Sequence, residues 1–157
     1  MNVWGALLTI GIAATPIIEL RGAIPLALSQ GFSPGASLAL ALLGNLAIVP
    51  ILLWGLEWIE NLLKRWTFTH RIMKWIFARS RRKGRWIERF GWLGLVLLVA
   101  IPLPGTGAWT GALAARLLGI DNKKALLWIA LGVLIAGVVV LLASRGVIHL
   151  FGLYEGS

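Results

Sequence analysis

Cysteine and charge are both scarce in this chain of 157 residues. The absence of cysteine excludes disulfides, thiolate metal sites and a thiol nucleophile. Only 13% of the residues are charged, whereas 59% are hydrophobic and the mean hydropathy is +0.86. This apolar share exceeds that of ordinary soluble domains. The composition therefore predicts an integral membrane protein.

The sequence also lacks the motifs of the common soluble enzymes and pumps. It contains no phosphate-binding loop, no dinucleotide fingerprint and no Ser, His, Asp nucleophile set. His70 and His149 each stand alone, so neither indicates a metal site. We therefore expect neither an enzyme nor an ATP-driven pump, with no catalytic residues, no cofactor and no metal.

Acidic residues are few, six against fifteen Lys and Arg, which gives a net charge of +9. Most of the basic residues lie between Lys64 and Arg89, in a short segment between apolar stretches. Such a segment is typical of the cytoplasmic side and attracts anionic lipid headgroups. Because apolar residues share one helical face from 62 to 77, we expect a basic amphipathic interfacial helix and loop over 62–89. Its partner would be the membrane, not nucleic acid.

Two apolar runs, Ala36 to Leu56 and Ala125 to Ala143, have the roughly 20 residues that a transmembrane helix needs. The stretches before them are interrupted by proline, glycine and charge. Their flanking pieces have only about a dozen residues and reach partway across the hydrocarbon core. This pattern predicts two re-entrant hairpins, with tips at residues 14–25 and 101–111.

The second half of the chain repeats the plan of the first. A shift of 88 residues matches Pro16 with Pro104, Ala27 with Ala115, Gly31 with Gly119, Leu38 with Leu126 and Gly44 with Gly132. Each repeat has one hairpin that returns and one helix that crosses, so the repeats, 2–60 and 90–148, would be inverted. We therefore predict an all-α integral membrane protein, a single domain of residues 1–157. It would be an inverted repeat of re-entrant helical hairpin plus transmembrane helix, joined by the interfacial helix.

Glu19 and Arg21 are the candidate functional charges, because they lie among apolar residues at the first tip. Charges at membrane depth are unfavourable unless they pair, face a cavity or act in function. Burial favours the neutral form of Glu19, which suits proton coupling, and Arg21 suits a phosphate or carboxylate. If the two touch, an incoming anion would compete with Glu19 for Arg21. The alternative is that the pair lies at the interface as an anchor.

The second tip carries no charge, but its prolines and glycines permit close backbone approach. Free amides at the start of the following half-helix could then face an anion. The alternative is a structural turn that packs against the first tip. The remaining candidates at the two tips are Gly22, Pro25, Pro102, Pro104, Gly105, Thr106, Gly107 and Thr110. In the first span, Asn45 is expected to hydrogen-bond to a neighbouring helix and so to stabilise the packing of the two helices.

The motifs ELRGAIP (19–25) and PLPGTGAWTG (102–111) resemble those of the prokaryotic small multidrug export proteins. These proteins look like a branch of the DedA / VTT-domain superfamily. The resemblance implies two re-entrant hairpins that face each other and the movement of phospholipids or undecaprenyl phosphate across the bilayer. DedA proteins proper usually carry arginine at the second hairpin, and this chain has none there.

The sequence thus favours a small secondary transporter or lipid translocase in the prokaryotic cytoplasmic membrane. Its substrate would be an anionic amphiphile, a phospholipid or polyprenyl phosphate, and proton coupling is one option for its transport. One alternative is a small exporter of drugs or other organic compounds, and another is a membrane-organising factor that transports nothing. A chain this small needs a partner to build a sealed path, so we expect a homodimer.

Overall fold

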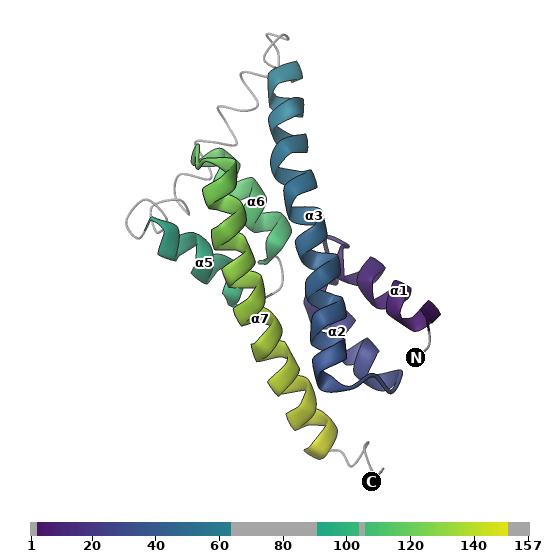
Figure 1. Ribbon diagram of the computed structural model, residues 1–157. Helices are drawn as coiled ribbons and strands as arrows, with labels where there is room; N and C mark the ends of the chain where they lie inside the picture. The colour runs from purple at the N-terminus through teal and green to yellow at the C-terminus, as the bar shows by residue number, and fades with distance from the viewer. Residues whose placement is uncertain (1–2, 64–90, 104–105, 151–157) are drawn as a thin grey trace.

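The computed structural model describes residues 3–63, 91–103 and 106–150, and in these ranges every regular element is an α-helix (Figure 1). The helices are α1 (Val3–Ala13), α2 (Glu19–Ser29), α3 (Pro34–Leu63), α5 (Trp92–Ala100), α6 (Ala108–Leu117) and α7 (Asn122–Leu150). Nearly all of the predicted interfacial segment, 62–89, lies outside the described residues, as do Pro104 and Gly105.

The two long helices, α3 and α7, cover the two runs that the sequence predicted as spans. Residues Pro34–Trp58 and Asn122–Gly146 are each long and apolar enough to cross a membrane. Only 33% and 39% of their most apolar windows are buried inside the protein. In α7 the buried hydrophobic side chains form a narrow stripe at helical spacing: Ala125, Ile129, Val133, Ala136 and Val140. A helix that is apolar all round but buried along one stripe presents its remaining faces to lipid.

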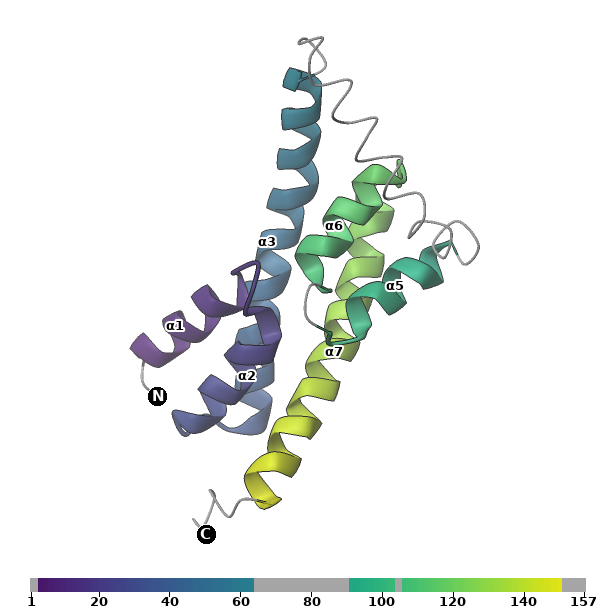
Figure 2. The same cartoon turned by 180° about the vertical axis from the view of Figure 1, so that it is seen from behind.

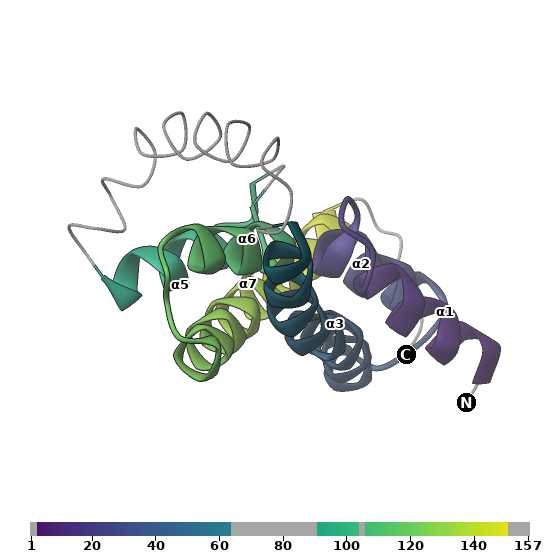
Figure 3. The same ribbon diagram turned by 90° about the horizontal axis from the view of Figure 1, so that it is seen from above.

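The four short helices form two hairpins, α1–α2 and α5–α6, which lie at the two flanks of the long pair and on the same face of it (Figures 2 and 3). Each short helix has 9 to 11 residues, or roughly 15 Å at the α-helical rise. The two turns lie near the middle of α3 and α7, and α2 and α6 leave them in opposite directions (Figure 1). The tips of the two hairpins therefore meet inside the bundle.

Each helix of the first half has the same kinds of neighbour as its counterpart in the second half. Helix α1 packs on α2 and α3, and α5 packs on α6 and α7. Helix α2 contacts both α3 and α7, and α6 contacts both α7 and α3. The long helices also pack on each other. If each helix is replaced by its counterpart in the other half, the same pairs of helices are in contact.

The turns that follow the hairpins are also alike in detail. Gly31 and Gly119 have φ of 82° and 66°, the left-handed conformation in which helices commonly end. The amide of Phe32 donates to the carbonyl of Ala27 at 3.1 Å, and the amide of Ile120 donates to that of Ala115 at 2.9 Å. The two donors, Phe32 and Ile120, are 88 residues apart, and so are the two acceptors, Ala27 and Ala115. Gly31 and Gly119, which the 88-residue shift matches, therefore end α2 and α6 in the same way.

Glycine also sets how closely each long helix approaches its hairpin. A Cβ on Gly44 of α3 would collide with the backbone of Ile10 in α1. A Cβ on Gly132 of α7 would come within 2.9 Å of the Val96 carbonyl in α5. The matched pair Gly44 and Gly132 thus marks the same helix crossing in both halves.

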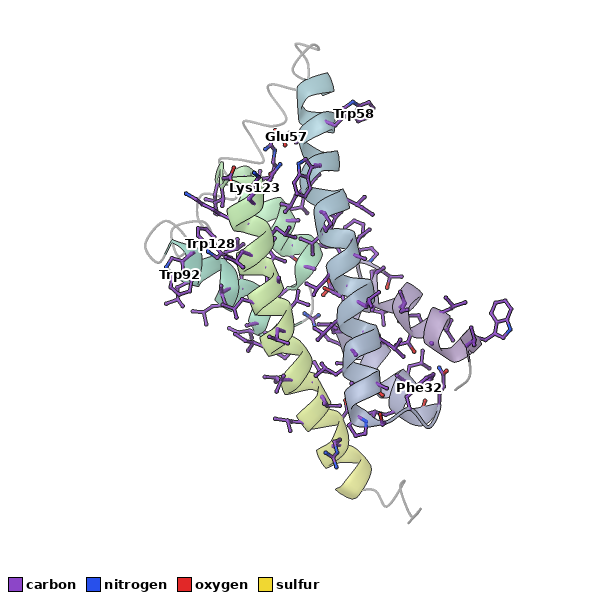
Figure 4. The ribbon with its side chains drawn as sticks, in the orientation of Figure 1. Phe32, Glu57, Trp58, Trp92, Lys123 and Trp128 are labelled. Carbon is purple, nitrogen blue, oxygen red and sulfur yellow. The ribbon has the colours of Figure 1, made fainter. Side chains whose placement is uncertain are left out.

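The two ends of the bundle carry different side chains. Glu57, Trp58 and Lys123 lie toward one end of the long helices, and Phe32 lies toward the other (Figure 4). Glu57 accepts a hydrogen bond from the Asn122 side chain and lies 4.0 Å from the Arg116 guanidinium. These contacts tie α3, α6 and α7 together at one end.

The turns are shorter than the sequence pattern predicted. Helix α2 begins at Glu19, so Gly22 and Pro25 lie within it rather than in the tip. Helix α6 begins at Ala108, so Thr110 and Gly111 belong to its first turn. Pro25 does not end α2, because helices in a membrane protein tolerate proline where neighbouring helices satisfy the freed carbonyl.

Candidate functional site

Glu19 is the only charged residue that is buried in the described part of the chain, with 5% of its surface exposed. It is the first residue of α2, and its φ of 49° places it in the left-handed region. A non-glycine residue in that region carries backbone strain, which is found most often at functional sites.

The Glu19 carboxylate reaches the start of α6 in the other hairpin. Its Oε1 accepts a hydrogen bond from the backbone amide of Trp109 at 3.4 Å. Its Oε2 fills the space beside Gly107, where an added Cβ would collide with it. The free amides and the dipole at a helix N-terminus favour a negative charge. Glu19 therefore occupies the place at α6 where the sequence predicted an anion.

Arg21 also bonds across to the second tip. Its Nη2 donates to the backbone carbonyl of Thr106 and, at 2.9 Å, to the Thr106 hydroxyl. That hydroxyl also accepts from the Leu103 amide at 3.1 Å and lies 2.6 Å from the Ile101 carbonyl and 2.7 Å from the Leu103 carbonyl. Since it has one proton, it donates to one of the two carbonyls. Thr106 thus joins Arg21 to the turn of the second hairpin.

Trp109 provides a third contact between the tips, which sequence reasoning missed. Its indole Nε1 donates to the carbonyl of Ala14 at 3.1 Å. The 88-residue shift would have identified it, because the shift places Trp109 on Arg21 and Gly107 on Glu19. Arg21 and Trp109 each donate to a carbonyl of the opposite tip, and Glu19 and Gly107 lie against each other.

The hydrogen bonds of Glu19 and Arg21 therefore run to the other hairpin. The sequence analysis left open whether the two side chains bond to each other. An anion that enters this structure meets an Arg21 that is bonded to Thr106, and an α6 N-terminus that is occupied by Glu19.

A small cavity lies between the tips and the long helices. Its lining includes Glu19, Arg21, Pro102 and Gly107 from the tips, and Asn45, Val99, Ala108, Val133, Ala136 and Val140 from the helices around them. The enclosed space has room for about one ordered water molecule. A headgroup of any size requires the tips to move apart.

Asn45 is the polar residue that α3 contributes to this cavity, and it is 1% exposed. Its Nδ2 donates to the carbonyl of Ala13 at the end of α1, at 3.0 Å. This bond confirms the predicted contact with a neighbouring helix. Its Oδ1, in contrast, is buried and has no hydrogen-bond partner in the described part of the protein.

The other candidate residues lie around this centre. Gly22 packs against the side chain of Ile18, which a Cβ would overlap. Pro25 lies further along α2, and Thr110 lies in the first turn of α6. Over residues 3–63, 91–103 and 106–150, no group of three or more His, Cys, Asp or Glu is placed to hold a metal ion.

Comparison with known proteins gives one match. The family model described as "Putative small multi-drug export protein" matches residues 19–139, well over half of the chain, and includes both tips. Neither a curated protein nor a solved structure matches the chain.

Proposed function

This chain belongs to the family of putative small multi-drug export proteins, and we propose that it is a secondary transporter whose substrate passes between the two hairpin tips. The substrate class is an anionic amphiphile, such as a phospholipid or a polyprenyl phosphate. Arg21 binds the anionic group, and Glu19 couples its movement to that of a proton.

This proposal rests on one observation: the side chains of Glu19 and Arg21, at the first tip, both form hydrogen bonds with the second hairpin. Buried charge in an apolar bundle is unfavourable unless it serves a purpose. Here Glu19 bonds to α6, and Arg21 bonds to Thr106. Opening the tips must break both contacts, so the same movement exposes a cation for the substrate and a carboxylate for a proton.

The transport route follows from a re-entrant, inverted architecture. Helices of about 15 Å reach only half of the roughly 30 Å hydrocarbon core. The exchange of equivalent contacts between the two halves supports an inverted repeat. Together with the two motifs, this architecture supports placing the family within the DedA / VTT-domain superfamily.

An amphiphile fits a site of this size better than a fully soluble anion does. The cavity is small, and the outer faces of α3 and α7 are apolar, with Leu43, Ile51, Leu127 and Leu142 exposed. A lipid can keep its tails along such faces while only its headgroup passes the tips. In this proposal the chain works as a homodimer in the prokaryotic cytoplasmic membrane. The basic segment 64–89 lies on the cytoplasmic headgroups, and the protein catalyses no reaction.

Reconstitution into vesicles tests the proposal directly. Purified protein is placed in vesicles that contain a labelled phospholipid or polyprenyl phosphate, and movement between leaflets is followed with and without a pH gradient. We expect Glu19→Gln and Arg21→Ala each to reduce the rate at least tenfold, because each removes one of the two charges that the movement exposes.

Matched control variants distinguish the loss of this site from a general effect of removing a charge. Arg145→Ala and Asp121→Asn each change an exposed charge that does not line the cavity, and both should transport at the normal rate. Normal transport by Glu19→Gln and Arg21→Ala would show that the site assignment is wrong. If the wild-type protein moves no lipid, the substrate class is wrong.

A second candidate, export of drug-like organic compounds, is favoured by the description of the family. Loading the same vesicles with fluorescent organic cations discriminates between the two functions. Cation movement that depends on Glu19 but not on Arg21 would support the exporter. If neither lipids nor organic cations move, the membrane-organising role is the remaining candidate.

A further inference from the structure

Only one of the two polar atoms of the Asn45 side chain has a hydrogen-bond partner among the described residues. Its amide group donates to Ala13, while its buried Oδ1 has no partner among the described residues. Buried acceptors are rarely left unpaired in folded proteins, so an exception needs an explanation. Because Asn45 lines the cavity, a hydrogen-bond donor placed there could supply the missing partner.

A carboxyl group needs different partners in its two charge states. The ionised form only accepts hydrogen bonds, whereas the protonated form also has an O–H to donate. In this structure Glu19 accepts from the Trp109 amide, an arrangement that suits the anion. The protonated form needs an acceptor as well.

The cavity contains such an acceptor. Glu19 and Asn45 line the same small space, which has room for about one water molecule. The only other charged side chain in the lining is Arg21, which donates but cannot accept. The lining residues of α5 and α7, Val99, Val133, Ala136 and Val140, are apolar. Asn45 is thus the one neutral side-chain acceptor that lines this space together with Glu19.

We propose that Asn45 positions the transported proton by accepting the O–H of protonated Glu19, directly or through one water molecule. The inference rests on the proposed function. Glu19 takes its proton from water when the tips open to one side, turns from Trp109 to Asn45, and returns the proton to water on the other side. The equivalent of Asn45 in the second half is Val133, so each chain has one such site.

Infrared difference spectroscopy between high and low pH, on the full-length protein in detergent, tests this assignment. The carbonyl stretch of protonated Glu19 is identified as the band that Glu19→Gln removes. We expect it at the frequency of a hydrogen-bonded carboxyl in the wild type and at a higher wavenumber in Asn45→Val. Thr9→Val, which removes the buried hydroxyl bond to Gly5, should leave the band in place.

The possible results separate this inference from the proposed function. An unshifted band in Asn45→Val overturns the inference and leaves proton coupling intact. A wild-type band at the frequency of a free carboxyl overturns it without any variant, should Asn45→Val not fold. If no band is lost in Glu19→Gln at any pH, Glu19 does not take up a proton and both proposals fail.

Discussion

Glu19 and Gly107 occupy equivalent places, each at the start of the second helix of its hairpin. Both have positive φ, 49° and 140°, and the carboxylate of one fills the space that a side chain of the other would need. Only one of the two positions can therefore carry a side chain. At this contact between the two halves, the two positions matched by the 88-residue shift therefore carry different residues.

This pairing predicts the effect of a methyl group at the second tip. Gly107→Ala should lower the free energy of unfolding by about 1–3 kcal/mol, because it adds backbone strain and displaces the Glu19 carboxylate. Thermal unfolding in detergent measures the loss. In a Glu19→Ala background the steric part should disappear, so the loss from Gly107→Ala should be smaller. Equal losses in both backgrounds would show that the two residues do not touch.

The sequence predicted some of these residues and missed others for a physical reason. Glu19, Arg21 and Thr106 stood out because charge and hydroxyl groups are unusual at an interrupted membrane helix. The role of Trp109 and the unpaired oxygen of Asn45 depend on contacts between segments far apart in the chain. No local pattern reports such contacts. Thr110 lies beside the site, in the first turn of α6, and its position alone does not assign it a role.

At the level of whole helices, prediction from sequence was close to the structure. The flanking pieces of about a dozen residues form short helices of 9 to 11 residues, because glycine, proline and charge interrupt otherwise uniform apolar runs. The tips were predicted too long, since the first turns of α2 and α6 contain residues that also occur in loops. The interfacial helix of 62–89 remains a prediction.

The repeat makes a quantitative prediction for the crossings of the long helices. Gly44→Ala and Gly132→Ala should each destabilise the protein by about 1–3 kcal/mol, because the new methyl group meets the backbone of α1 or α5. Thermal unfolding in detergent measures both. Gly55→Ala is the control, because nothing lies within 4 Å of its Cβ position, and it should be neutral or slightly stabilising. A loss at only one of the two crossings would contradict equivalent packing.

At the scale of the whole molecule, composition and hydropathy were enough to predict two helices that are long and apolar enough to cross a membrane. The side of the membrane on which each hairpin starts is a different question, because it depends on how the bilayer surrounds the bundle. The basic segment predicts that the α5 end of the second hairpin is cytoplasmic. The central claim is that both hairpins return to the side from which they enter, one from each side.

Cysteine labelling tests that claim most directly, since the chain has no cysteine of its own. Single variants Val3→Cys and Ser33→Cys mark the two ends of the first hairpin, and Trp92→Cys and Asp121→Cys mark those of the second. In oriented vesicles, a membrane-impermeant maleimide should label the first two from one side and the last two from the other, cytoplasmic side. Labelling of Val3→Cys and Ser33→Cys from opposite sides would show that the first hairpin crosses the membrane, and would contradict the account.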